Sequence, residues 1–356
     1  MADIMEEAIA KMMQEKAAFN AEFGADINLA IPKYEDPTRY PVAELIELFH
    51  CQQKLTMDVP PEEREKRKAE FRAKRDAIRL LPDAPERVYL WKAGNVPTES
   101  DYTDNAGHSF DHEPDFRPYY LEMLLPEGET PIGGIVLVAG GTHGAGSINE
   151  CYQVGKEFNA LGYQCFILQC RPNQCPWTRK ETAADAARAF QMIRANAEKY
   201  RLRPDTLAFA GFSNGGITGD AVIEFFSEHQ QVKDYFPDYV PDELDAFFGA
   251  PDAYLTVYGV RHAGTVLSRP HFAYPPTFIA VGRQDLQCLA STREFLPWLW
   301  EQGTPVEIHT FAGHPHGYAG WKINNGTGDY NFDLWVTHAD VFLRDLFIGY
   351  DPKLDF

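Results

Sequence analysis

The chain has 356 residues, of which 44% are hydrophobic and 24% are charged, and these proportions are typical of a globular protein rather than of a fibrous or disordered one. Its 52 acidic residues exceed its 33 Lys and Arg residues, which gives a formal net charge of −19. We do not expect such an acidic chain to bind nucleic acid or anionic membranes, because both require clustered positive charge.

The start of the chain lacks the pattern of a secretory signal, and no apolar run reaches the roughly 18 residues of a membrane-spanning helix. The cysteines form no Cys-x-x-Cys pair, so a zinc or redox site is not expected. We predict a cytoplasmic protein with free thiols and no metal or organic cofactor. The six cysteines are Cys51, Cys151, Cys165, Cys170, Cys175 and Cys288.

Residues 1–85 are predicted to form a helical extension. Apolar residues fall near helical spacing between Ile4 and Phe19, and further helices are expected at Val42–Leu55 and Pro61–Leu81. The last of these is dense in charge, which favours a solvated helix face with i,i+4 ion pairs. We expect the extension to cap a site or to mediate self-association into a homo-oligomer.

Residues 86–356 are predicted to form a catalytic domain of the α/β class, in which short β-rich runs alternate with helical segments. This alternation predicts a mostly parallel sheet with helices on both faces. The predicted strands are Val88–Trp91, Arg117–Leu125, Gly134–Ala139, Tyr163–Leu168, Thr206–Ala210, Ala253–Tyr258, Thr277–Val281 and Val306–Phe311. The predicted helices are Ser147–Leu161, with a capping-box spacing of Ser147 and Glu150, then Thr182–Tyr200, Asn214–Glu228, Ser291–Gln302 and Asp333–Phe347.

A Gly-x-Ser-x-Gly pattern, Gly211 to Gly215, lies between a predicted strand and a predicted helix. In that context the chain turns sharply and holds the serine at the carboxyl edge of the sheet, at a helix N-terminus. We therefore predict Ser213 as a nucleophile; the alternative is a glycine-rich helix start with a capping serine. A serine hydroxyl also needs a base, and the base needs an acid to orient it.

The acid is predicted to be Asp285, which follows the strand Thr277–Val281 and so lies at the same edge as the serine turn. The alternative role for Asp285 is the N-cap of the next helix. Two other acids, Asp245 and Asp252, precede a strand and would lie at the opposite edge.

The base is predicted to be His316, in the segment that follows the last strand. Gly317 beside it permits a tight loop, whereas His314 lies closer to the strand and is expected to support that loop. The chain order of serine, acid and histidine is the order of α/β-hydrolases.

The oxyanion hole is predicted to combine the backbone N–H of Asn214 with the glycine-rich loop after the strand Gly134–Ala139. Gly141 and Thr142 are the candidates in that loop; the alternative is a plain turn. Phosphate binding is not supported, because neither Gly-x-Gly-x-x-Gly nor a P-loop is present.

The stretch from about Tyr89 to Phe347 resembles the acetyl-xylan-esterase-like and feruloyl-esterase-like carbohydrate esterases of the α/β-hydrolase superfamily. The segments that carry this resemblance are LPEG at Leu125–Gly128, VLVAGG at Val136–Gly141, GYQCFIL at Gly162–Leu168, GFSNGG at Gly211–Gly216, PDAYLTVYG at Pro251–Gly259 and HGY at His316–Tyr318. The resemblance implies an α/β-hydrolase fold and deacylation of sugar esters without a cofactor. Thr142, His143 and Asn214 depart from the family pattern, and His143 and Tyr318 are expected to contact the substrate.

The sequence thus predicts a serine esterase that acts on a small-molecule or oligosaccharide ester through an acyl-enzyme. Two alternatives stay open. One is a serine peptidase of the prolyl-oligopeptidase type, which shares the serine turn but carries a propeller domain that is not predicted here. The other is a catalytically inactive hydrolase fold that serves as an interaction module.

Overall fold

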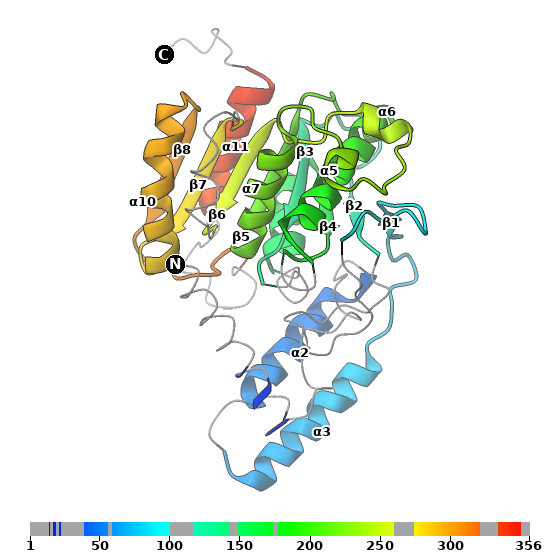
Figure 1. Ribbon diagram of the computed structural model, residues 1–356. Coiled ribbons are helices and arrows are strands. Elements are labelled where there is room, and N and C mark those ends of the chain that lie inside the picture. Colours follow the sequence, from blue (N-terminus) through cyan, green and yellow to red (C-terminus); the bar gives the residue numbers. More distant parts are fainter. Residues whose placement is uncertain are drawn as a thin grey trace.

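The computed structural model describes residues 39–55, 59–99, 117–141, 149–173, 177–259, 274–320 and 334–349, with a few positions between 14 and 22. Its centre is an eight-stranded sheet with the order β1-β2-β4-β3-β5-β6-β7-β8 (Figure 1). β1 and β2 pair antiparallel with their neighbours, and the strands from β4 to β8 in that order pair in parallel. The strands are β1 (Val88–Tyr89), β2 (Tyr119–Met123), β3 (Gly133–Val138), β4 (Tyr163–Gln169), β5 (Leu207–Phe212), β6 (Ala253–Val257), β7 (Thr277–Gly282) and β8 (Val306–Phe311).

Helices cover both faces of the sheet, as the alternating pattern predicts (Figure 1). One face packs on α5 (Arg179–Ala195), α7 (Asn214–Phe226) and α10 (Leu286–Glu301), the other on η5 (Asn149–Gln153), α4 (Val154–Ala160) and α11 (Leu334–Phe347). Neighbouring strand residues alternate between the two cores: Val136 joins the first, whereas Ile135 and Leu137 join the second. The short helices are α6 (Ala197–Tyr200), α8 (Val232–Tyr235) and η6 (Glu243–Ala246).

Two N-terminal helices, α2 (Val42–Leu55) and α3 (Pro61–Ala77), pack against each other. Figure 1 shows them beyond the edge at which the parallel strands end. Glu47 forms an ion pair with Lys74, and Arg67 Nη1 donates to the carbonyl of Lys54 at 2.7 Å. The α2 bounds match the prediction, but α3 ends before Leu81 because the buried Ile78 adopts an extended conformation.

Two predicted helix starts are wrong, each because of a cap. The helix predicted from Thr182 begins at Arg179, since Thr178 and Glu181 form a capping box, and it breaks into α5 and α6 at Asn196. α10 begins at Leu286 rather than at Ser291, because the Asp285 carboxylate accepts a hydrogen bond from the backbone N–H of Cys288. Ser147 lies outside the described residues, and the carboxylate of Glu150 accepts from Gly140 and Tyr258.

A buried ion pair ties the end of β4 to α5. Both oxygens of Asp185 accept from the guanidinium of Arg171, at 2.9 Å from Nε and 2.7 Å from Nη2, and Trp91 Nε1 donates to the same carboxylate at 2.7 Å. The side chains of Arg171 and Asp185 are 2% and 0% exposed. A charge this deep is tolerated only because it is paired and hydrogen-bonded.

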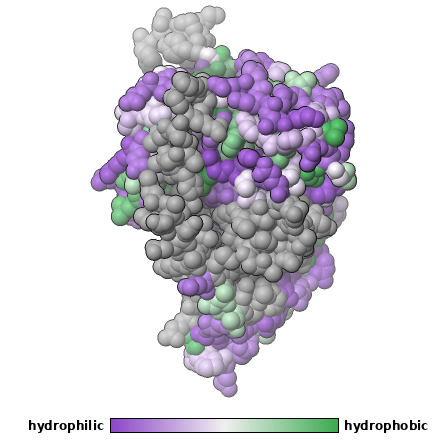
Figure 2. Space-filling view, viewed as in Figure 1, coloured by the Kyte–Doolittle hydropathy of each residue, from purple (hydrophilic) through white to green (hydrophobic). Residues whose placement is uncertain are grey.

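Among the described residues, no helix is both long and apolar enough to cross a bilayer. Figure 2 shows that the described side chains on one face are mainly hydrophilic, with scattered hydrophobic ones. Five cysteines within the described ranges are buried and carry reduced thiols, as expected from the sequence: Cys51, Cys151, Cys165, Cys170 and Cys288. Cys175 lies outside those ranges.

Candidate active site

Ser213 lies at the tip of the turn between β5 and α7, with φ 50° and ψ −115°, a conformation that a non-glycine residue rarely adopts. The turn is tight because its glycines lie against backbone. A Cβ on Gly211 would approach the carbonyl oxygen of Gly215 to 2.5 Å, and one on Gly215 would approach that of Val138 to 2.1 Å. The local sequence therefore forces the serine side chain out at the carboxyl edge of the sheet.

His316 and Asp285 complete a hydrogen-bonded chain with this serine. Ser213 Oγ lies 2.9 Å from His316 Nε2, and His316 Nδ1 lies 2.5 Å from Asp285 Oδ2. The other oxygen of Asp285 accepts from the N–H of Cys288 at 3.1 Å. Asp285 thus fills both roles considered for it, helix cap and partner of the histidine. The structure brings the three predicted residues together from three separate loops.

The surroundings of Asp285 and His316 shift the pKa values of both side chains. Burial opposes ionisation of Asp285, but hydrogen bonds from His316 and Cys288 outweigh it and lower the pKa of the carboxyl below its ordinary value. Burial also disfavours the protonated form of His316, yet the hydrogen bond and charge of Asp285, with the charge of Glu150, raise the pKa of the imidazole above its ordinary value. The pair is therefore suited to an ionised acid beside a histidine that accepts a proton.

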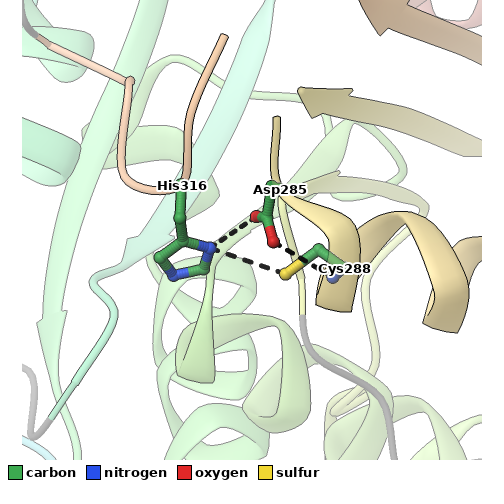
Figure 3. A group of neighbouring side chains, drawn as sticks. All are labelled: Asp285, Cys288 and His316. Atoms are coloured by element: carbon green, nitrogen blue, oxygen red, sulfur yellow. Dashed lines mark hydrogen bonds and ion pairs between the residues drawn. The ribbon is translucent and has the colours of Figure 1, made fainter. Parts of the chain in front are cut away.

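Cys288 is a neighbour of the histidine that the sequence analysis did not assign. Figure 3 shows Asp285 and Cys288 reaching from the start of α10 toward the same ring nitrogen of His316. The Sγ atom of Cys288 lies 3.5 Å from His316 Nδ1, and the S–H of Cys288 donates to the carbonyl of Tyr258 at 3.0 Å. Because the thiol is 1% exposed, it packs behind the imidazole rather than facing solvent.

The predicted oxyanion residues are described only in part. The side chain of Asn214 donates to the carbonyl of Gly141 at 2.6 Å, which ties the loop after β3 to the start of α7. Gly141 has φ +62°, a conformation that favours glycine. Thr142 and His143 lie outside the described residues.

Tyr318 is completely buried, and its ring packs 4.8 Å from Tyr258 and 4.6 Å from His314. His314 stacks on Phe311 at 4.8 Å, and its carbonyl accepts from Gln284 N–H at 3.2 Å. His314 thus supports the loop that carries His316. Tyr318 contacts the same loop from inside, so substrate contact by Tyr318 stays a prediction.

A buried acid that the sequence analysis placed in a helix cap lies at this site instead. Glu150 accepts from the N–H of Gly140 at 2.6 Å and from the hydroxyl of Tyr258 at 2.8 Å. Its spacing from Ser147 fitted a capping box, and no signal in the sequence links it to residues 10 and 108 positions away.

Two groups of described side chains bring three possible metal ligands within 4.8 Å of one another. In the first, Asp285, Cys288 and His316, the ring nitrogen between acid and thiol is already hydrogen-bonded to the acid. In the second, His309 Nε2 lies 2.6 Å from Glu307, and its ring stacks on His338 at 4.1 Å and 20°. In both groups, a histidine nitrogen already lies within hydrogen-bond distance of a carboxylate oxygen.

Comparison with solved structures identifies the fold. An acetyl ester-xyloside bifunctional hydrolase from Caldicellulosiruptor lactoaceticus aligns at 21% identity over 74% of this chain and 96% of its own, with a TM-score of 0.56. Esterase 2 of Thermogutta terrifontis, phosphorylated by paraoxon, aligns at 15% identity over 75% of this chain and 96% of its own, with a TM-score of 0.54. The native form of that esterase aligns at 18% identity over 77% of this chain and 96% of its own, with a TM-score of 0.52. No protein-family model and no curated protein matches the sequence. The predicted α/β-hydrolase fold is confirmed.

Proposed function

We propose that the protein is a serine hydrolase that cleaves carboxylic esters, with Ser213 as nucleophile, His316 as general base and Asp285 as the acid that orients it. The observation that carries this proposal is the unbroken chain of hydrogen bonds from Ser213 Oγ through the imidazole to the Asp285 carboxylate. The strained turn before α7 presents the hydroxyl at the carboxyl edge, which is where this fold places its nucleophile.

The reaction follows from this geometry as a double displacement. His316 Nε2 takes the proton of Ser213 as Oγ attacks the ester carbonyl, and Asp285 stabilises the imidazolium that forms. The backbone N–H of Asn214 and the loop of Gly141 and Thr142 are proposed to hold the oxyanion. The imidazolium then protonates the leaving alcohol, and water, activated by the same histidine, releases the acid from the acyl-enzyme.

We propose a carbohydrate ester, acetylated or feruloylated, as the substrate class. The sequence segments that resemble carbohydrate esterases support it, as does the printed name of the similar hydrolase, which refers to an acetyl ester and a xyloside. His143 and Tyr318 are the proposed substrate contacts. Residues 1–85 are proposed to cap the site or to mediate self-association, and the buried thiols are compatible with the cytoplasm.

The test is the variant Ser213→Ala with a panel of esters. We expect the variant to fold and to lose about 10³-fold or more of the turnover of the wild type, as for loss of a triad nucleophile. Acetylated and feruloylated oligosaccharides should be cleaved faster than simple alkyl esters, and a proline-containing p-nitroanilide should not be cleaved. A fluorophosphonate probe should label the wild type and not the variant. Near-normal turnover in folded Ser213→Ala would refute the assignment.

A further inference from the structure

We propose that Glu150 is a positioning residue of the site, which holds the loop after β3 against the nucleophile and places a second negative charge behind His316. The inference rests on the proposed function and extends it to a residue outside the triad. Glu150 lies in η5, which follows that loop, and its side chain points back into the protein, since the residue is 8% exposed.

Both carboxylate oxygens of Glu150 are held by donors from different parts of the chain. Oε2 accepts from the backbone N–H of Gly140 at 2.6 Å, and Oε1 accepts from the hydroxyl of Tyr258 at 2.8 Å. Burial raises the pKa of Glu150 above its ordinary value, and the two hydrogen bonds that its oxygens accept favour the ionised form against that rise. The carboxylate therefore fixes the loop and the residue after β6 relative to each other.

Gly140 shows how closely this arrangement approaches the nucleophile. A Cβ placed on Gly140 would lie 2.8 Å from the Cβ of Ser213 and 3.2 Å from Oε2 of Glu150. The backbone of Gly140 is thus packed between the serine and the acid. From the other side, the Asn214 side chain holds the carbonyl of Gly141 at 2.6 Å. Hydrogen bonds therefore hold the loop at two successive residues, Gly140 through Glu150 and Gly141 through Asn214.

Tyr258 connects the same carboxylate to the base. It follows β6 with φ 39°, an unusual conformation for a tyrosine, and its ring centroid lies 5.1 Å from that of His316. Its own backbone is fixed, because its N–H donates to Ala280 at 2.7 Å and its carbonyl accepts from the thiol of Cys288 at 3.0 Å. The strained backbone is over-determined by these bonds, as is typical of functional positions.

The charge of Glu150 acts on His316 through a buried environment. Burial raises the pKa of Glu150, while the hydrogen bonds from Gly140 and Tyr258 and the charge of His316 oppose that rise. Among the described residues, the groups that face Glu150 or His316 are Cys151 on η5, Asp285 and Cys288 at α10, Tyr258 after β6, Ser213 before α7, and His314 and Tyr318 on the histidine loop. Within the part of the chain that the structure describes, Glu150 and Asp285 are the acids that favour the imidazolium.

The main test is Glu150→Gln, which keeps the volume and an acceptor for Gly140 but removes the charge. We expect kcat to fall about tenfold to a hundredfold, as for residues that orient a functional group from behind, with KM little changed. The midpoint of the acid limb of kcat/KM should move to lower pH, because one of the two charges that raise the pKa of His316 is lost. A merely structural residue would not move this midpoint.

Two further variants keep the test decisive. Tyr258→Phe retains the carboxylate but removes one of the hydrogen bonds that favour its ionised form, so kcat should fall and the midpoint should not move to higher pH. Glu224→Gln makes the same chemical change at another buried glutamate, which pairs with Arg179 at 2.7 Å, and should leave both kcat and the midpoint unchanged. If Glu150→Gln does not fold, a wild-type kcat in folded Tyr258→Phe would overturn the proposal.

The outcomes separate this inference from the proposed function. If the wild type cleaves esters and reacts with a fluorophosphonate probe, yet folded Glu150→Gln has the kcat and midpoint of the wild type, Glu150 has no positioning role. If the wild type neither cleaves esters nor reacts with the probe, the proposed function itself is wrong. Folding of each variant is checked by urea-induced unfolding.

Discussion

Asp185 and Asp285 are two buried carboxylates of one protein, and they differ in what they are bonded to. Asp185 is 0% exposed and is held by the guanidinium of Arg171, whereas Asp285 is 6% exposed and is held by the imidazole of His316. An arginine stays protonated inside proteins, while a histidine gains and loses a proton near neutral pH. A buried acid is therefore a fixed structural link in the first setting and a usable part of a proton relay in the second.

The largest expected effect comes from a change at Asp285, the carboxylate that is bonded to a histidine. Asp285→Asn should reduce kcat by about 10³- to 10⁴-fold, because an amide in place of the carboxylate no longer stabilises the imidazolium and favours the wrong tautomer of His316. Its free energy of unfolding should change little, since the amide oxygen can still accept from Cys288. Kinetics and urea unfolding on the same preparation check both statements. A folded Asp285→Asn protein with wild-type kcat would remove the distinction drawn above.

The matching change at Asp185, the carboxylate that is bonded to an arginine, should reduce stability rather than kcat. Asp185→Asn leaves the guanidinium of Arg171 buried and only partly paired, which should lower the free energy of unfolding by about 3–5 kcal/mol. The kcat per folded molecule should stay that of the wild type, because none of the contacts of Asp185 reaches Ser213 or His316. Urea unfolding measures the first quantity, and the maximal rate divided by the concentration of active sites, titrated with a fluorophosphonate, gives the second. A large loss of kcat with intact stability would contradict this prediction.

The smallest expected effect is on pH dependence, and it sharpens the comparison. In the proposed mechanism His316 is a base only when neutral, so kcat/KM should be full above its pKa and fall by about tenfold per pH unit well below it. Burial lowers this pKa, but the combined upward effect of Asp285 and Glu150 is larger. The midpoint should therefore lie above the ordinary value of 6.5. Asp285→Asn should move the midpoint down, whereas Asp185→Asn should not. A wild-type midpoint below 6.5 would show that burial dominates.

Most of the fold could be predicted because local signals and periodicity agree in it. β8 and α2 have the predicted bounds, and the apolar runs of β3, β4 and β5 differ by one or two residues at their ends. The errors occur where a side chain decides a boundary. Asp285 starts α10 five residues before the predicted Ser291, because its carboxylate binds a backbone N–H as well as the histidine.

The serine, acid and histidine could be placed because each follows the carboxyl end of a strand, and parallel strands bring those ends to one edge. Glu150 could not be placed in this way. It lies in a helical segment, where a spacing of three from Ser147 gave it a local explanation, and its partners Gly140 and Tyr258 meet it only in the folded protein. Tyr258 likewise gave no sign of its left-handed backbone conformation.

The buried thiols have a practical consequence of their own. Cys51 lies in α2, Cys165 in β4 and Cys288 at the start of α10, and they are buried in the native state, with exposures of 8%, 0% and 1%. An alkylating reagent can modify such a thiol only while its surroundings are transiently open. The unmodified protein therefore carries its own reporters of opening, and mass spectrometry of briefly alkylated samples would show whether the N-terminal helix pair opens before the sheet or together with it.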